Sequence, residues 1–175
     1  AEGESLVVAG DEESDAVAAR VARAVARGEL ALGRRPVGGI RLQAPISAEG
    51  AAWVGFSIEG AEPVEVLARG LGPSFAGSGA EDPKLSVYRL QAGQALALLP
   101  NDNWRDGAQF VGENESAQGA FRALETGFEA LALSVLEDEA KDAALRVWLE
   151  PGDYLILLEL SDGAAGSGLL EVFAL

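Results

Sequence analysis

The residues best suited to chemistry lie between positions 101 and 106, in a polar stretch that follows an apolar run and a proline. Side-chain oxygens of Asp and Asn are ligands that calcium prefers, and calcium takes six to eight oxygen ligands. Asp82 and Asp142 lie near the ends of neighbouring predicted strands and offer further carboxylates. The pattern therefore predicts a candidate calcium site with the ligands Asn101, Asp102, Asn103 and Asp106.

The same stretch also has a structural interpretation. Asn and Asp side chains bond their own backbone and accept left-handed conformations, so they are frequent in turns. In this interpretation Trp104 closes the edge of the fold behind the turn, and no ion is bound. The spacing of an EF-hand loop is absent. Both interpretations stay open from the sequence, and calcium is the single cofactor considered.

The composition argues against an enzyme. The 175 residues include no His and no Cys, which removes the usual general base, the commonest metal ligand, and all thiolate and disulfide chemistry. Lys84 and Lys141 stand outside any recognisable serine–lysine motif. Among 28 acids some pair of carboxylates always resembles a glycosidase pair on paper, so their number is no signal. We expect a non-enzymatic protein.

Carbohydrate binding would require exposed aromatic side chains. The candidates are Trp53, Trp104 and Trp148. Trp53 and Trp148 lie in strand-like runs, which favours a place in the core or in an interface. Binding of a polysaccharide or of calcium, as an adhesion or accessory module of the cell surface, is the alternative function.

The charge is large, negative and unevenly distributed. A net charge of −15 argues against nucleic acid and anionic lipid as partners. Residues 16–41 nevertheless hold six arginines against one glutamate, a net +5, which leaves −20 for the rest of the chain. Such asymmetry is typical of charges that match each other within one chain or between chains.

Two features predict a secreted protein of the cell surface. The sequence holds no run of 18 apolar residues, so no transmembrane segment is expected. It begins Ala1-Glu2-Gly3 without a Met, which is typical of a chain whose signal peptide has been removed, or of a trimmed chain.

Residues 1–39 are predicted to form an N-terminal arm. Residues 5–9 (SLVVA) form an apolar, strand-like run, and residues 14–28 have the spacing of a short amphipathic helix. Ser14 is a good N-cap, and residues 33–39 are rich in Gly, Arg and Pro and predict a linker.

The predicted helix has a stripe of arginines opposite a narrow apolar stripe. Three interpretations are open. The helix caps the chain's own domain, or the strand and helix together dock on a neighbouring chain, or the helix lies on a membrane surface. The third is the weakest, because the apolar stripe is Ala and Val without aromatic anchors.

Residues 40–175 are predicted to form one β-sandwich domain. Apolar and polar residues alternate from position 40 onward, with turns rich in Gly and Pro between the runs. Residues 154–160 are apolar throughout and predict a central strand that is buried on both faces. About nine strands result, which suits a two-sheet antiparallel, jelly-roll-like sandwich. Residues 117–124 and 128–135 fit a strand or a helix.

From about residue 40 the chain carries seven landmarks in order, R-x-x-G-P-S at 69–74, D-P-x-L-x-x-Y at 82–88, N-D-N-W at 101–104, G-A-F at 119–121, D-A-A-L at 142–145, L-x-P-G-x-Y at 149–154 and L-x-E-V at 169–172. With these landmarks it resembles a β-sandwich domain that recurs in large secreted proteins of environmental bacteria. More distantly it is similar to bacterial pre-peptidase C-terminal domains, which are accessory modules, some of them calcium-binding. The resemblance implies secretion and a β-sandwich, and no chemistry.

Two departures from that pattern matter. Residues 125–141 are longer and more acidic than the pattern, and the arm has no counterpart in it. We therefore expect a structural subunit that assembles head to tail with copies of itself into an extracellular filament or surface layer, the arm docking on a neighbour by strand donation. The predicted assembly interface consists of Leu6, Val7, Val8, Arg20, Arg23 and Arg27.

Overall fold

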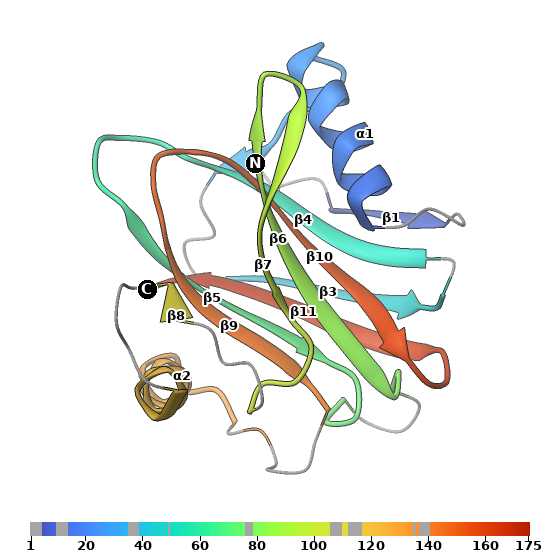
Figure 1. Cartoon of the computed structure of the whole chain (residues 1–175), viewed down its shortest axis with the longest axis vertical. Helices are drawn as coiled ribbons and strands as arrows, with labels where there is room; N and C mark the ends of the chain where they lie inside the picture. The colour runs from blue at the N-terminus through green and yellow to red at the C-terminus, as the bar shows by residue number, and fades with distance from the viewer. Residues whose placement is uncertain are drawn as a thin grey trace.

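The computed structural model describes residues 5–9, 14–34, 39–48, 50–75, 79–105, 110–111, 117–134, 136 and 141–175. Over these ranges it holds 11 strands and two helices, in two sheets with a helix against each outer face. Figure 1 shows α1 beside sheet A and α2 at the opposite side, beside β9. The fold is therefore a mainly antiparallel two-sheet β-sandwich, as the sequence predicts.

Sheet A has the order β1-β4-β10-β6-β7, with antiparallel pairs. A short strand, β2 (Gly33–Arg34), runs parallel to β4 on the same edge as β1. The other strands are β1 (Ser5–Ala9), β4 (Gly50–Ile58), β6 (Asp82–Gln91), β7 (Gln94–Asn101) and β10 (Gly152–Asp162).

Sheet B has the order β3-β11-β5-β9-β8. Its pairs are antiparallel except for the parallel pair of β8 and β9. The strands are β3 (Ile40–Ile46), β5 (Val64–Leu71), β8 (Phe110–Val111), β9 (Ala143–Leu149) and β11 (Gly166–Ala174).

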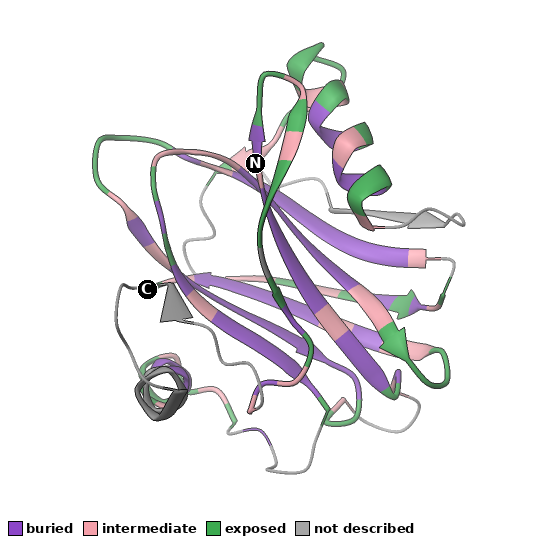
Figure 2. Cartoon of the chain, in the orientation of Figure 1, coloured by how far each residue is buried: buried purple, intermediate pink, exposed green. Residues whose placement is uncertain are grey.

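The main core lies between the sheets and follows the alternation of the strands. In β4, for example, Val54 and Phe56 belong to this core, whereas Trp53, the residue before Val54, belongs to the cluster under α1. Because a strand places successive side chains on opposite faces, each sheet buries a second apolar face only if something covers it. β10 is buried from Tyr154 to Leu158, since both faces of sheet A are covered there (Figure 2).

Helix α1 (Ser14–Ala26) forms where the sequence predicts a helix. Asp15 in the first turn and Arg23 in the last turn complement the helix dipole. Beyond the last turn, Gly28 has a φ of +69°, a left-handed conformation that favours glycine and ends the helix.

Helix α2 (Ala117–Ala130) resolves a segment that the sequence leaves undecided. Leu124 and Phe128, four residues apart on one helical face, are buried against the outer face of sheet B. Their cluster includes Leu67 and Leu71 of β5, Ala144 of β9 and Phe173 of β11.

The observed strands also test the remaining predictions about the fold. The central strand at 154–160 and the strand at 5–9 are confirmed as β10 and β1. The predicted linker at 33–39 begins with the short strand β2, and residues 35–38 lie outside the described residues. Within residues 40–175 the described ranges hold nine strands, β3 to β11, which is the number expected.

Candidate functional site

The outer face of sheet A carries an apolar patch that the helix of the arm covers. Trp53 of β4, Tyr88 of β6 and Leu155 and Leu157 of β10 are buried there. Against them α1 places its small apolar stripe, Val17, Ala18, Val21 and Ala22. We call this patch, together with the β4 edge beside it, the arm seat.

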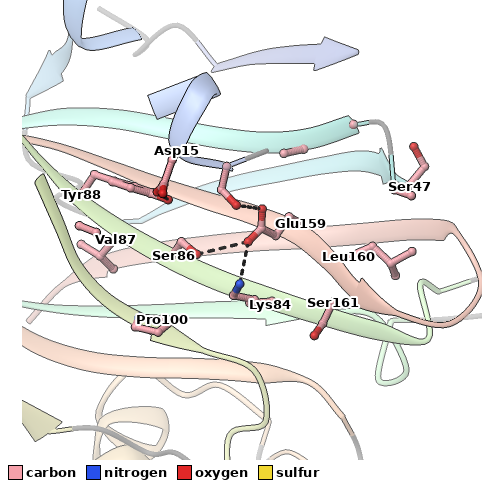
Figure 3. A pocket seen from close by; sticks show the side chains of 15 residues that line it. Asp15, Ser47, Lys84, Ser86, Val87, Tyr88, Pro100, Glu159, Leu160 and Ser161 are labelled. Atoms are coloured by element: carbon pink, nitrogen blue, oxygen red, sulfur yellow. Dashed lines mark hydrogen bonds and ion pairs between the residues drawn. The ribbon is translucent and has the colours of Figure 1, made fainter. Parts of the chain in front are cut away.

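A polar cluster fixes the start of α1 to the arm seat (Figure 3). The carboxylate of Glu159, on β10, accepts a hydrogen bond from the Ser14 hydroxyl and another, at 3.4 Å, from the Ser86 hydroxyl. The ammonium group of Lys84 pairs with the same carboxylate at 3.3 Å. The first residue of α1 is therefore held by a side chain 145 positions away in the sequence.

A second bond joins the next residue of the helix to β6. The Tyr88 hydroxyl donates to Oδ1 of Asp15 at 2.8 Å. Burial raises the pKa of Tyr88 well above its usual range, and the hydrogen bond and charge of Asp15 raise it further. Tyr88 therefore stays protonated and keeps donating over the whole physiological pH range.

A cavity of about 560 Å³ opens beside these contacts, lined by α1, β6, β10 and the turn between β3 and β4. Two sets of bonds join the polar side chains that line it: Glu159 accepts from Ser86 and pairs with Lys84, and Asp15 accepts from Tyr88. Their arrangement orients the helix and neutralises charge.

The strand of the arm pairs with β4 in a single antiparallel register. Leu6 lies opposite Trp53, Val7 opposite Ala52 and Val8 opposite Ala51. β10 takes the other edge of β4. The three arm residues predicted for an assembly interface thus lie on the edge of sheet A, paired with their own chain in this structure.

The predicted arginine stripe lies on the outside of the arm. Arg20, Arg23 and Arg27 are exposed, on the opposite side of α1 from its buried stripe. The guanidinium group of Arg27 lies 3.9 Å from the Glu29 carboxylate, with both side chains largely exposed. An exposed pair of this kind contributes little to stability.

The corner at 101–104 is built mainly as a structural turn. The side-chain oxygen of Asn101 accepts a hydrogen bond from the Ala144 backbone at 2.9 Å, and its amide reaches the carbonyl of Asn103 at 3.4 Å. Trp104 is fully buried and packs on Phe128 with ring centroids 6.1 Å apart. The indole thus closes the edge of the sandwich beneath α2, as the structural interpretation expects.

Two further carboxylates stand near this corner. Asp142 is fully buried, and its Oδ1 accepts bonds from the backbone of Gly72 at 2.7 Å and Ser74 at 3.3 Å. Lys141 pairs with Asp82 at 3.0 Å. The hydrogen bond and charge of Asp82, with smaller effects of Asp162 and Asp102, raise the pKa of Lys141. The ammonium group of Lys141 is therefore a cation that Asp82 already faces.

The oxygen ligands that the sequence predicts for a calcium ion are only partly brought together at this corner. Within the described ranges no group of three or more His, Cys, Asp or Glu side chains could hold a metal ion. The side-chain oxygen of Asn101 already accepts a hydrogen bond from the backbone of Ala144, and Asp106 lies outside the described residues. The buried oxygens Asp82 Oδ1 and Asp142 Oδ2 have no partner there. Calcium binding by Asn101, Asp102, Asn103 and Asp106 stays a prediction.

The three tryptophans differ in exposure in a way that the strand pattern does not predict. Trp53 and Trp104 are 2% and 0% exposed, whereas Trp148 on β9 is 50% exposed. The sequence also gives no sign of the cluster around Glu159, because its members come from three distant segments. The nearest signal is a single acid, Glu159, inside the most apolar run of the chain.

No protein-family model matches the chain, and no curated protein matches it. Among solved structures it is similar to the pre-peptidase C-terminal domain of collagenase from Bacillus anthracis, at 9% identity. The match covers 81% of this chain and 94% of that chain, with a TM-score of 0.40. Among the described helices, none has the length and apolarity needed to cross a membrane.

Proposed function

We propose that this protein is a non-enzymatic structural subunit that assembles with copies of itself, outside the cell, into a filament or surface layer. The arm of one copy occupies the arm seat of the next. The observation that carries the proposal is the seat itself, since a strand edge and an apolar patch of the sandwich are both completed by the same separate segment.

The seat needs an occupant, whichever chain supplies it. Without β1, the edge of β4 would keep only the two-residue pairing with β2, and open strand edges readily recruit another chain. Without α1, Trp53, Leu155 and Leu157 would face water. These contacts are identical for an arm that comes from the same chain and for one that comes from a neighbour.

The arm joins a different sheet from the strand that follows it. The described parts of the arm, β1, α1 and β2, join sheet A, whereas β3, the first strand after residues 35–38, joins sheet B. An arm supplied by another copy would make the same contacts with sheet A. Exchange of an identical element is a low-cost route to assembly, and a head-to-tail exchange that does not close grows a filament.

The distribution of charge supports the same arrangement. Arg20, Arg23 and Arg27 are exposed on the arm, and the residues outside 16–41 carry a net −20. An arm with a positive outer face reduces the repulsion between two strongly acidic copies. The extracellular location follows from the resemblance of the motifs to domains of secreted proteins.

The test uses the absence of cysteine in the natural sequence. Copies with Val8→Cys alone are mixed with differently tagged copies with Ala51→Cys alone, and the mixture is oxidised mildly. Val8 lies directly opposite Ala51, where a disulfide is feasible. A mixed covalent dimer on a non-reducing gel is expected, because each chain carries one cysteine and the two types meet only by exchange.

The matched control replaces Ala51→Cys by Glu62→Cys, in the turn after β4 and outside the β1 pairing. If the Val8–Ala51 mixture gave no more mixed dimer than this control at high protein concentration, the arm would serve its own chain only. The proposal would also fail if the unmodified protein sedimented as a monomer under the same conditions.

A further inference from the structure

A small apolar platform stands on the outer face of sheet B, beyond the cover of α2. Trp148 is 50% exposed there, and Leu175 is 40% exposed. Glu65 of β5 lies directly opposite Trp148, and the Leu175 backbone donates to the Glu65 carbonyl at 2.8 Å. The three residues therefore form a row across β9, β5 and the end of β11.

An ion pair borders this platform. The guanidinium group of Arg146 donates to Glu65 Oε1 at 2.6 Å and to the Thr126 hydroxyl at 3.1 Å, so α2 and β5 fix its plane. Arg146 precedes Trp148 by two residues on the same strand and faces the same side of the sheet. An exposed indole thus lies next to charged groups that are held in place.

We propose that Trp148 is the stacking platform of a binding site for a neutral pyranose unit of a polysaccharide. One face of a pyranose ring consists of C–H groups, which pack on the electron-rich face of an indole. The sugar hydroxyls beside the ring meet the accessible edge of the ion pair of Glu65 and Arg146, whose side chains are 12% and 19% exposed.

The charge of the chain selects the class of sugar. Glu65 and the exposed Glu150 both lie close to Trp148 in the fold, and the net charge is −15. Repulsion therefore disfavours uronic acids and sulfated sugars, and a neutral chain of hexoses or N-acetylhexosamines fits best.

The size of the platform favours a sugar ring over a protein partner. Among the described residues, Leu96, Leu98, Trp148 and Leu175 are the large apolar side chains that are exposed, and two of them form this platform. A stable protein interface buries about 800 Å² on each partner, far more than these two side chains offer. This inference does not depend on assembly through the arm.

The test follows tryptophan fluorescence, which reports on this site because Trp53 and Trp104 are buried. The protein is titrated with three neutral hexasaccharides, built from glucose, mannose and N-acetylglucosamine, and with hexagalacturonic acid. We expect a saturable change with at least one neutral probe and weaker binding of the acidic one. By calorimetry, Trp148→Ala should weaken the binding about tenfold or more, whereas Trp148→Phe should keep most of it.

Trp148→Ala removes an exposed side chain, so the variant is expected to fold, and far-UV circular dichroism verifies this. The proposal is overturned if none of the neutral probes gives a saturable change, if Trp148→Ala binds as the natural protein does, or if hexagalacturonic acid binds equally well. It is also overturned if the fluorescence of Trp148 changes on dilution of the protein alone, since the platform would then contact another copy.

Discussion

The two helices cover the two outer faces of one sandwich, but they are attached to it differently. α1 meets sheet A with small side chains, Val and Ala. α2 meets sheet B with Leu124 and Phe128, and Phe128 packs against the buried Trp104. The α2 side therefore interlocks large side chains, whereas the α1 side rests on a shallow contact.

The polar contacts of the two helices differ in the same way as their apolar contacts, since those of α2 are the more deeply buried. On the α2 side Arg69 and Glu171 form a buried ion pair, and Arg69 also donates to the Ser134 carbonyl at 2.7 Å and lies 5.2 Å from the centre of the Phe128 ring. On the α1 side the polar contacts lie around an open cavity, as in the bond of Tyr88 to Asp15. Buried pairs strongly penalise the loss of one partner, whereas accessible bonds can be replaced by water.

Under the proposed function, the α2 cover belongs to the domain and the α1 cover is the one that copies exchange. We expect the loss of the α2 contacts to disrupt sheet B. We expect α1 and β1 to leave sheet A with a smaller loss, which the proposed exchange requires. Three predictions test the contrast, beginning with the largest effect.

Phe128→Ala should lower the free energy of unfolding by about 3–5 kcal/mol, because it leaves a cavity beneath α2 between Trp104 and Arg69. Urea denaturation measures the loss. Glu129→Ala, at an exposed position of the same helix, should change the stability by less than about 0.5 kcal/mol. A loss for Phe128→Ala as small as that of the control would mean that α2 is not part of the cooperative domain.

Val21→Ala should cost about 1.5 kcal/mol, the equivalent of two buried methyl groups at about 0.8 kcal/mol each. Because Val21 belongs to the contact of α1 with sheet A, the variant should also speed formation of the mixed disulfide between Val8→Cys and Ala51→Cys copies. Arg23→Lys, which keeps the charge at an exposed position of the same helix, is the control for stability. A loss equal to that of Phe128→Ala would remove the contrast between the two covers.

Tyr88→Phe should cost about 1 kcal/mol near pH 8, since it removes the hydrogen bond to Asp15. The pKa of Tyr88 is raised in the folded state, so its contribution is complete below the unfolded value of about 10 and is lost as the pH rises above it. Melting curves should therefore converge above about pH 10. Tyr154, whose pKa is also raised by burial, is present in both proteins and cancels. Parallel curves would contradict the role given to Tyr88.

Local patterns explain why much of the fold could be predicted. Ser14 and Gly28 mark the ends of α1, and the alternation in β4 separates Val54 and Phe56 from Trp53, because these signals depend on neighbours in the sequence. The apolar residues of 117–135 fit a strand or a helix equally well, so the contacts of Leu124 and Phe128 with sheet B decide for the helix α2.

The candidate sites could be predicted much less well. The sequence identifies Asn101 and Trp104 as a landmark, but their partners Ala144 and Phe128 are remote, and these partners decide that the corner is chiefly structural. The pairing of Lys141 with Asp82 joins residues 59 positions apart and carries no local signal.

The sequence by itself determined the sandwich, the separate arm, the arginine stripe and the unequal charge, because periodicity and charge act over short distances along the chain. Only the tertiary structure decided which faces are covered. It placed Glu159 at the start of α1, buried Trp53 under that helix, and left Trp148 in water beyond the end of α2. Alternation assigns a side chain to a face of its sheet, but whether that face meets solvent depends on segments that the chain brings there from far away.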